Sequence, residues 1–172
     1  MINEQARVHL ERCIALAREA LEAGDDPFGS VLVDGNGEML CEARNRVVTG
    51  EATEHPELTL ARWAAANMAP EARTQATVYT SGEHCPMCAA AHAWAGLGRI
   101  VFISSSEQLG EWLARLGAPA SPVRMLSIRE VAPDVAVEGP VPALVDEVRA
   151  LHEHRHGGGH RTVLPITGSF ER

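Results

Sequence analysis

Three things are scarce in this sequence: positive charge, cysteine and long apolar runs. Lys and Arg number 15 against 23 Asp and Glu, so the formal net charge is −8 with histidine neutral. A protein that binds nucleic acid through a broad basic surface needs the opposite balance. We therefore do not expect nucleic acid as a partner.

Only four cysteines occur in 172 residues, which is too few for a disulfide framework. Cys13 and Cys41 stand alone in a helical and a strand-like pattern, and we expect them to pack as small apolar side chains. The first residues are amphipathic and charged and lack the apolar core of a signal peptide. No apolar run approaches the roughly 18 residues that cross a bilayer. We expect a cytoplasmic protein without a membrane partner.

The chain is nevertheless apolar enough to fold, because 45% of its residues are hydrophobic and 22% are charged. Apolar spacing, an N-cap at Asn3 and early prolines predict helices at 3–23, 55–68, 86–97, 107–116 and 142–152. Two further runs flank the hairpin signal Asp34-Gly35-Asn36-Gly37, and strands are predicted at 76–81, 99–103 and 123–128. This order predicts an α/β fold with three layers, α/β/α, around a five-stranded mixed sheet.

We predict one domain over residues 1–154 and a flexible C-terminal tail over 155–172. Four alternating histidines in the segment 152–160 fix no metal geometry, so we favour a solvated tail over a metal site there. They are His152, His154, His156 and His160. Apolar residues near the end, Leu164 to Ile166 and Phe170, leave open a lid, a swap onto a neighbouring subunit or a frayed terminus.

His55, Cys85 and Cys88 have the residue types and the spacing of metal ligands. Two thiolates three residues apart at a helix start lie on one face of the first turn, where backbone N–H groups and the helix dipole stabilise negative sulfur. A histidine from another helix start supplies the third ligand. Three protein ligands leave a fourth position open, which is typical of a catalytic Zn²⁺ site. His84 is the nearest fourth candidate, but we expect its side chain to point away.

Glu57 follows His55 by two residues at the same predicted helix start. Zinc lowers the pKa of bound water towards about 7. Removal of an amine also requires that the leaving ammonia gain a proton. A carboxylate beside the metal can carry that proton without being a ligand. We therefore predict that Glu57 is the catalytic acid and base.

The order His-x-Glu followed by Pro-Cys-x-x-Cys is the signature of the zinc deaminases. The chain resembles the cytidine deaminase-like superfamily from about residue 5 to about residue 130. Two departures stand out, because Pro56 fills the middle of the first motif and His84 replaces the first proline of the second. Neither removes a ligand, but both can alter the local loops.

The chain is most similar to the bacterial guanine deaminases and their purine-deaminating relatives, which include the tRNA adenosine deaminases. Asp26-Pro27-Phe28-Gly29, the strand Val31 to Asp34, and Asn45 match that branch. The resemblance implies that Asn45 hydrogen-bonds the substrate and that Phe28 walls the base. Core packing and turn capping are the alternatives for Phe28 and Asn45 respectively.

Trp94 stands where guanine deaminases carry a tryptophan, although the neighbouring tyrosine of that branch is replaced by Ala93. The resemblance implies a substrate contact for Trp94, and packing inside the helix layer is the alternative. Glu51 and Glu54 lie close to the ligand His55 and would repel the phosphates of a tRNA.

We therefore expect a zinc-dependent aminohydrolase with a small nucleobase-like substrate, best read as guanine converted to xanthine and ammonia. Cytosine, a nucleoside, an aminotriazine, a pterin and tRNA adenosine remain alternatives. A non-catalytic zinc module is disfavoured because Glu57 has no structural role at a zinc site. The resemblance also implies a homodimer, for which Trp63 and the alanine-rich stretch 61–66 offer a close-packing face. An internal contact between helices is the alternative explanation for these residues.

Overall fold

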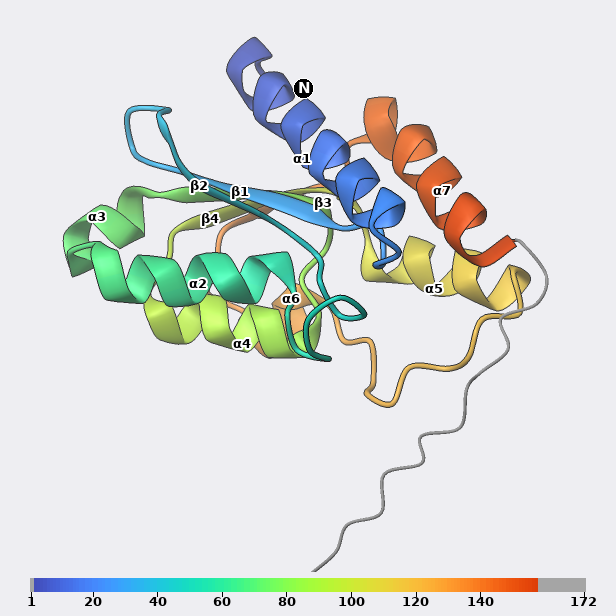
Figure 1. Ribbon diagram of the computed structural model, residues 1–172. Helices are drawn as coiled ribbons and strands as arrows, with labels where there is room; N and C mark the ends of the chain where they lie inside the picture. The colour runs from blue at the N-terminus through green and yellow to red at the C-terminus, as the bar shows by residue number, and fades with distance from the viewer. Residues whose placement is uncertain (1, 158–172) are drawn as a thin grey trace, which may run out of the picture.

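The computed structural model describes residues 2–157, which fold around one five-stranded sheet with helices on both faces (Figure 1). The helices are α1 (Glu4–Glu22), α2 (Pro56–Asn67), α3 (Pro70–Gln75), α4 (Pro86–Ala95), α5 (Ser106–Arg115), α6 (Ile128–Val131) and α7 (Pro142–Gly157). The strands are β1 (Gly29–Val33), β2 (Met39–Arg44), β3 (Thr77–Gly82), β4 (Arg99–Ser104) and β5 (Val137–Glu138). No helix among residues 2–157 is long and apolar enough to cross a membrane.

The sheet is mixed, as predicted, with the strand order β2-β1-β3-β4-β5. β1 pairs antiparallel with β2 and β3, whereas β3–β4 and β4–β5 are parallel. The predicted hairpin joins β1 to β2. Its turn is held by the Asp34 carboxylate, which accepts the backbone N–H groups of Asn36 and Glu38 at 2.8 and 2.9 Å, and by Gly37 at φ +89°.

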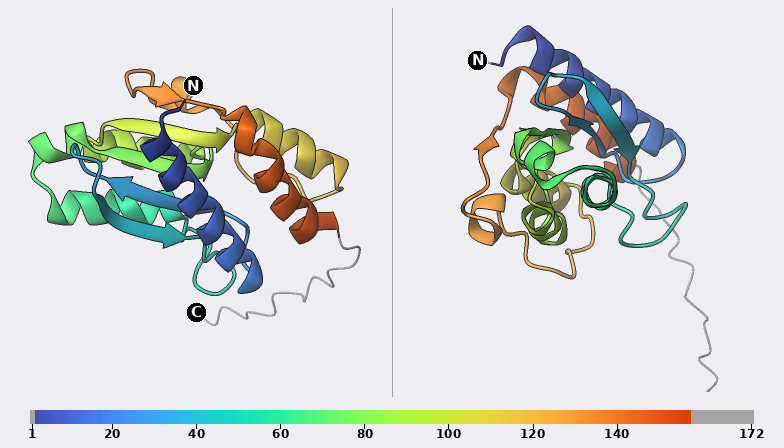
Figure 2. Two further views of the ribbon diagram at one scale, coloured as in Figure 1. Left: turned by 90° about the horizontal axis from the view of Figure 1, so that it is seen from above. Right: turned by 90° about the vertical axis from the view of Figure 1, so that its left-hand side faces the viewer.

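Alternate residues along each strand face opposite helix layers. Val31, Tyr79 and Val101 pack with α1, α5 and α7, whereas Leu32 and Val78 pack with α2. Figure 1 shows α1 and α7 above the sheet and α2 and α4 below it, and the view from above in Figure 2 places α1 and α7 side by side. The expected three layers are confirmed.

The helix starts follow local sequence signals. Asn3 caps α1 by accepting the Ala6 N–H at 2.8 Å, as predicted. Pro56 and Pro86 occupy the first positions of α2 and α4, where a missing N–H costs no helical hydrogen bond. His55 and Cys85 are therefore the N-cap residues of two helices that pack against each other.

The strand predicted at 123–128 is wrong. Val123 and Met125 are exposed, and Ser127 instead begins α6 through a capping box in which its hydroxyl and backbone N–H both contact the Glu130 carboxylate at 2.8 Å. The fifth strand is the two-residue β5, in which Val137 pairs with Ile100 of β4. The run 123–128 resembles a strand in composition, but of its residues only Ile128 is fully buried.

Helix α7 continues beyond the predicted end at His152 to Gly157. His152 is buried, with its ring centroid 4.9 Å from that of Phe28 and 6.1 Å from that of Trp112, so the solvated state expected for this histidine is wrong. The buried residues of α7 are Leu144, Val148, His152 and Arg155. The last two are polar, and they are buried because His152 contacts Phe28 and Trp112 and Arg155 pairs with Asp26, partners that are distant in the sequence. His160 and the predicted lid lie outside the described residues, and the division at residue 155 stays a prediction.

Candidate active site

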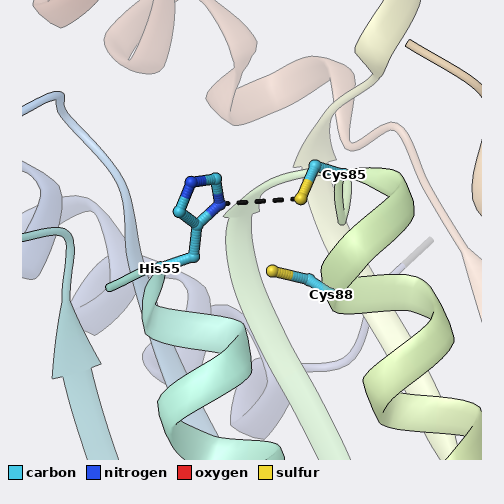
Figure 3. A group of neighbouring side chains, drawn as sticks. All are labelled: His55, Cys85 and Cys88. Atoms are coloured by element: carbon cyan, nitrogen blue, oxygen red, sulfur yellow. Dashed lines mark hydrogen bonds between the residues drawn. The ribbon is translucent and has the colours of Figure 1, made fainter. Parts of the chain in front are cut away.

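The structure brings His55, Cys85 and Cys88 together at the N-terminal ends of α2 and α4 (Figure 3). One ligand atom from each residue lies within 4.8 Å of the other two, and His55 Nδ1 is 3.6 Å from Cys85 Sγ. A tetrahedral zinc ion with bonds of about 2.1 Å to nitrogen and about 2.3 Å to sulfur would hold such atoms about 3.6–3.8 Å apart. The spacing and the chemistry of these three donors therefore fit zinc.

The electrostatics of the group favour a thiolate. Hydrogen bonding with Cys88 lowers the pKa of the Cys85 thiol to about 4, against the opposing effect of burial, and His55 adds to the lowering. The same contact with Cys85 raises the pKa of His55. A thiolate is the form of cysteine that binds metal, so Cys85 is already in its ligating form. The contact with Cys85, together with burial, raises the pKa of Cys88, so this second thiol has to lose its proton when zinc binds.

Glu57 lies beside this group but is not part of it. It is 6% exposed, and its Oε1 accepts hydrogen bonds from Ser30 Oγ at 3.1 Å and Thr80 Oγ1 at 2.9 Å. Burial raises the pKa of Glu57. Its Oε2 makes no hydrogen bond to the described protein, which leaves one carboxylate oxygen for a reacting group.

Ser30 and Thr80 are functional neighbours that the sequence analysis missed. They face each other across the β1–β3 register, and their hydroxyl oxygens lie 2.9 Å apart. Both are fully buried, Ser30 in the otherwise apolar strand β1 and Thr80 next to the buried Tyr79 of β3. A hydroxyl at such a position needs a polar partner, which is the signal that could have pointed to them.

Asn45 is 2% exposed and lies in the loop between β2 and α2. Its backbone N–H donates to the Phe28 carbonyl at 2.9 Å, and its Oδ1 accepts the Val47 N–H at 3.0 Å. The turn-capping contact is therefore present. Its side-chain nitrogen makes no hydrogen bond within residues 2–157, so Asn45 still has a free amide donor.

Phe28 is half-buried and packs against both the core and His152. Its ring also covers the end of β3, since a Cβ added at Gly82 would lie 2.9 Å from the ring. Gly82 precedes the ligand Cys85 by three residues. Phe28 therefore makes the core contacts that were the alternative to a substrate contact. Its ring also lies over the end of β3, the strand that leads to Cys85.

Trp94 is not brought to this group. It lies near the opposite end of α4, nine residues from Cys85, or about 14 Å at 1.5 Å per residue, and it is 91% exposed. The substrate contact expected for Trp94 is therefore not made within one chain, and packing inside the helix layer is wrong as well.

His84 is buried and lies outside the ligand group. Its ring meets that of His92 edge-on, with centroids 5.4 Å apart. The adjacent Glu83, which the sequence analysis did not single out, accepts the backbone N–H groups of Ser106 and Ile128 at 2.8 and 2.9 Å. A carboxylate at two helix N-termini is stabilised by both helix dipoles, so Glu83 ties α5 and α6 to the ligand loop.

Residues 3–104 match the model of the cytidine and deoxycytidylate deaminase zinc-binding region. A probable cytosine deaminase from Schizosaccharomyces pombe is 29% identical over 163 residues, which cover 92% of this chain and 96% of that protein. The guanine deaminase of Bacillus subtilis is 39% identical over 88 residues, or 50% of this chain and 56% of that protein.

The fold has solved counterparts. The guanine deaminase structure from Nitrosomonas europaea superposes with a TM-score of 0.65 at 19% identity, covering 91% of this chain and 86% of that one. At this identity the likeness concerns the fold alone. The family match, however, spans more than half of the chain and includes all three ligands and Glu57. The chain belongs to the cytidine and deoxycytidylate deaminase family of zinc-binding hydrolytic deaminases.

Proposed function

We propose that this deaminase acts on a free nucleobase and that guanine is its first substrate. One observation carries the reaction type: a buried carboxylate, Glu57, lies beside three zinc-type ligands with one oxygen free. The match to the Bacillus subtilis guanine deaminase, at 39% identity over 88 residues, supports the choice of base.

The mechanism follows from the positions of the side chains. When bound by His55, Cys85 and Cys88, zinc supplies an acidified water at neutral pH. Glu57 accepts one proton of the attacking water and passes it to a ring nitrogen, while the water oxygen forms a bond to the ring carbon that bears the amine. Glu57 then accepts the second proton from that oxygen and gives it to the departing nitrogen as the bond between the ring carbon and the amine breaks. The products are xanthine and ammonia, so atoms and charge balance.

Two residues are proposed to hold the base. The free amide nitrogen of Asn45 donates a hydrogen bond to a ring or carbonyl acceptor, and the ring of Phe28 covers one side of the plane. The two residues lie next to each other, because the Asn45 backbone N–H donates a hydrogen bond to the Phe28 carbonyl. Trp94 is omitted because of its distance from the ligands.

Cytosine is the second candidate, because the probable cytosine deaminase from Schizosaccharomyces pombe aligns over almost its full length. Ammonia release from guanine, cytosine, adenosine, cytidine and an anticodon stem-loop separates the alternatives. We expect the fastest release from guanine. Cytosine as the sole substrate would replace guanine, whereas editing of the stem-loop with no activity on a free base would overturn the proposal.

We also propose a homodimer and a cytoplasmic location, both predicted from the sequence. From α2, Ala61, Ala64 and Trp63 pack against the core and make the internal contact of the alternative explanation. Ala65 and Ala66 of α2 and Trp94 of the neighbouring helix α4 remain exposed. Such a small-residue face with a large aromatic ring suits a second copy. Light scattering should give about twice the chain mass of 18.5 kDa. A mass of one chain would exclude the dimer, and Trp94→Arg should weaken it.

A further inference from the structure

Asp25 is a fully buried carboxylate in the turn between α1 and β1. Its Oδ1 accepts the backbone N–H groups of Val48 and Thr49 at 2.8 and 2.9 Å. Its Oδ2 accepts the Thr49 hydroxyl at 2.7 Å and Arg44 Nη1 at 2.9 Å. Burial opposes ionisation of Asp25, but these hydrogen bonds outweigh it and lower its pKa to about 2. The side chain is therefore a charged acceptor, which binds N–H and O–H donors more strongly than a neutral one.

All four donors belong to residues that flank Asn45 in the chain. Arg44 comes immediately before it, and Val48 and Thr49 follow it by three and four residues. Arg44 Nη1 also donates to the Asn45 carbonyl at 3.0 Å. One carboxylate thus holds the chain on both sides of Asn45.

The same region is tied to Phe28 and leads to the ligand His55. The Asn45 N–H donates to the Phe28 carbonyl at 2.9 Å, and the Arg46 N–H donates to the Glu54 carbonyl at 3.0 Å, one residue before His55. Asp25 itself is not among the metal ligands and contacts neither Glu57 nor the ligand side chains through any hydrogen bond of residues 2–157. Because its hydrogen bonds hold the residues on both sides of Asn45, we expect its effect on a bound base to pass through Asn45.

We propose that Asp25 is a positioning residue for deamination, which fixes the Asn45 amide relative to the group His55, Cys85 and Cys88. The proposal rests on the proposed function, since it requires that Asn45 contact the substrate. Displacing a substrate-orienting group by about 1 Å can reduce the rate about 10²-fold.

The test is a double-mutant cycle on kcat/KM. Asp25→Asn keeps the shape of the side chain but removes its charge and turns one acceptor into a donor. We expect it to lower kcat/KM about 10–100-fold, with zinc content unchanged. In the Asn45→Ala background the same substitution should lower kcat/KM less than about 2-fold, because the group that Asp25 positions is gone.

Asp34→Asn is the matched control. Asp34 also accepts two backbone N–H groups in a tight turn, but it lies in the β1–β2 hairpin. We expect this variant to lower Tm and leave kcat/KM unchanged. Thr49→Val, which removes one of the four hydrogen bonds to Asp25, provides a milder form of the test if Asp25→Asn does not fold. It should lower kcat/KM about 3–10-fold, again only when Asn45 is present.

An equal loss from Asp25→Asn with and without Asn45 would overturn the proposal, and so would a loss of zinc or an unchanged kcat/KM in the variant that folds. The proposed function fails in a different way: the wild-type protein would deaminate no free base, or Asn45→Ala alone would leave kcat/KM unchanged. The two failures are therefore distinguishable.

Discussion

The two faces of the sheet are built from different side chains. The face under α1, α5 and α7 is filled by large residues, among them Leu10, Ile14, Tyr79 and Trp112. The face over α2 and α4 also contains large residues such as Leu60 and Ile100, but its two helices contribute small ones to the core, including Ala61, Ala64 and Ala89. Small side chains let helices approach closely, and this second face carries every ligand of the proposed metal site. One face supplies most of the buried apolar bulk, and the other brings two helix N-termini together.

The largest expected effect separates chemistry from packing on the second face. Glu57→Gln should retain about one zinc per chain and a nearly unchanged Tm, while kcat falls about 10²–10⁴-fold because the proton carrier is lost. Elemental analysis and ammonia release measure the two quantities. Cys85→Ala serves as the comparison, since it should lose zinc and activity together. Near-normal turnover of Glu57→Gln would contradict the mechanism.

The next effect contrasts the two faces directly. Leu10→Ala on the first face should lower the free energy of unfolding by about 2–5 kcal/mol through a cavity, with zinc affinity unchanged in the folded protein. Ala64→Leu on the second face should cost about 1–3 kcal/mol by overpacking and should also weaken zinc binding, because α2 is pushed from its neighbours. Urea denaturation and zinc titration decide between these outcomes. Equal zinc affinity in both variants would contradict the expectation that only the packing of the second face affects the metal site.

A smaller effect on stability is expected for the ion pair between Arg155, near the end of α7, and Asp26. Arg155 Nε donates to Asp26 Oδ1 at 2.9 Å, and the arginine side chain is 3% exposed while that of Asp26 is 34% exposed. Asp26→Asn should destabilise the protein by about 1–3 kcal/mol, because it leaves a buried cation unpaired. Arg155→Met should cost less, since it leaves only a partly exposed carboxylate. Thermal unfolding of both variants tests this asymmetry, and the reverse order would contradict it.

The last predicted effect is a loss of stability at acidic pH through the buried His152, and it is absent at neutral pH. Burial lowers the pKa of His152 to about 4, with a further lowering from His156 and an opposing effect from Asp26. In the unfolded chain His152 binds a proton near pH 6.5, whereas in the folded protein it stays neutral down to about pH 4. The contribution of His152 to stability is therefore fully present above about pH 6.5 and is lost as the pH falls towards 4.

Measuring Tm between pH 7.5 and 4 tests this dependence. His152→Leu should make the decrease of Tm with falling pH less steep. Part of the decrease should remain, because burial also lowers the pKa of His92. The exposed neighbour His154 provides the control, since His154→Leu should leave the pH dependence as it is. An unaltered slope in His152→Leu would refute the assignment.

Local signals account for what the sequence predicted correctly. Asn3, Pro56, Pro86 and the Asp34 turn each act within a few residues, and the ligand spacing follows from two helix starts. The spacing from His55 predicted Glu57 as the catalytic acid and base, but nothing in that spacing predicted the hydroxyls of Ser30 and Thr80, which contact Glu57 across 27 and 23 residues of sequence.

Long-range partners account for the errors. The end of α7 depends on Asp26, 129 residues away from Arg155, and β5 depends on pairing with β4 over two residues. Neither of these two contacts can be recognised from a periodic pattern of apolar residues in the sequence. The box of Ser127 and Glu130, by contrast, is a local signal, and it outweighs the strand-like composition of the residues before it.

The prolines that follow two of the ligands restrict the ligands themselves. A residue before proline is confined to extended conformations, and His55 (φ −80°, ψ 139°) and Cys85 (φ −64°, ψ 165°) both lie there. The backbone of these two ligands is thus preorganised before any metal arrives. Zinc capture has little chain entropy to overcome at these positions, so chelation should empty the site while the fold that surrounds it persists.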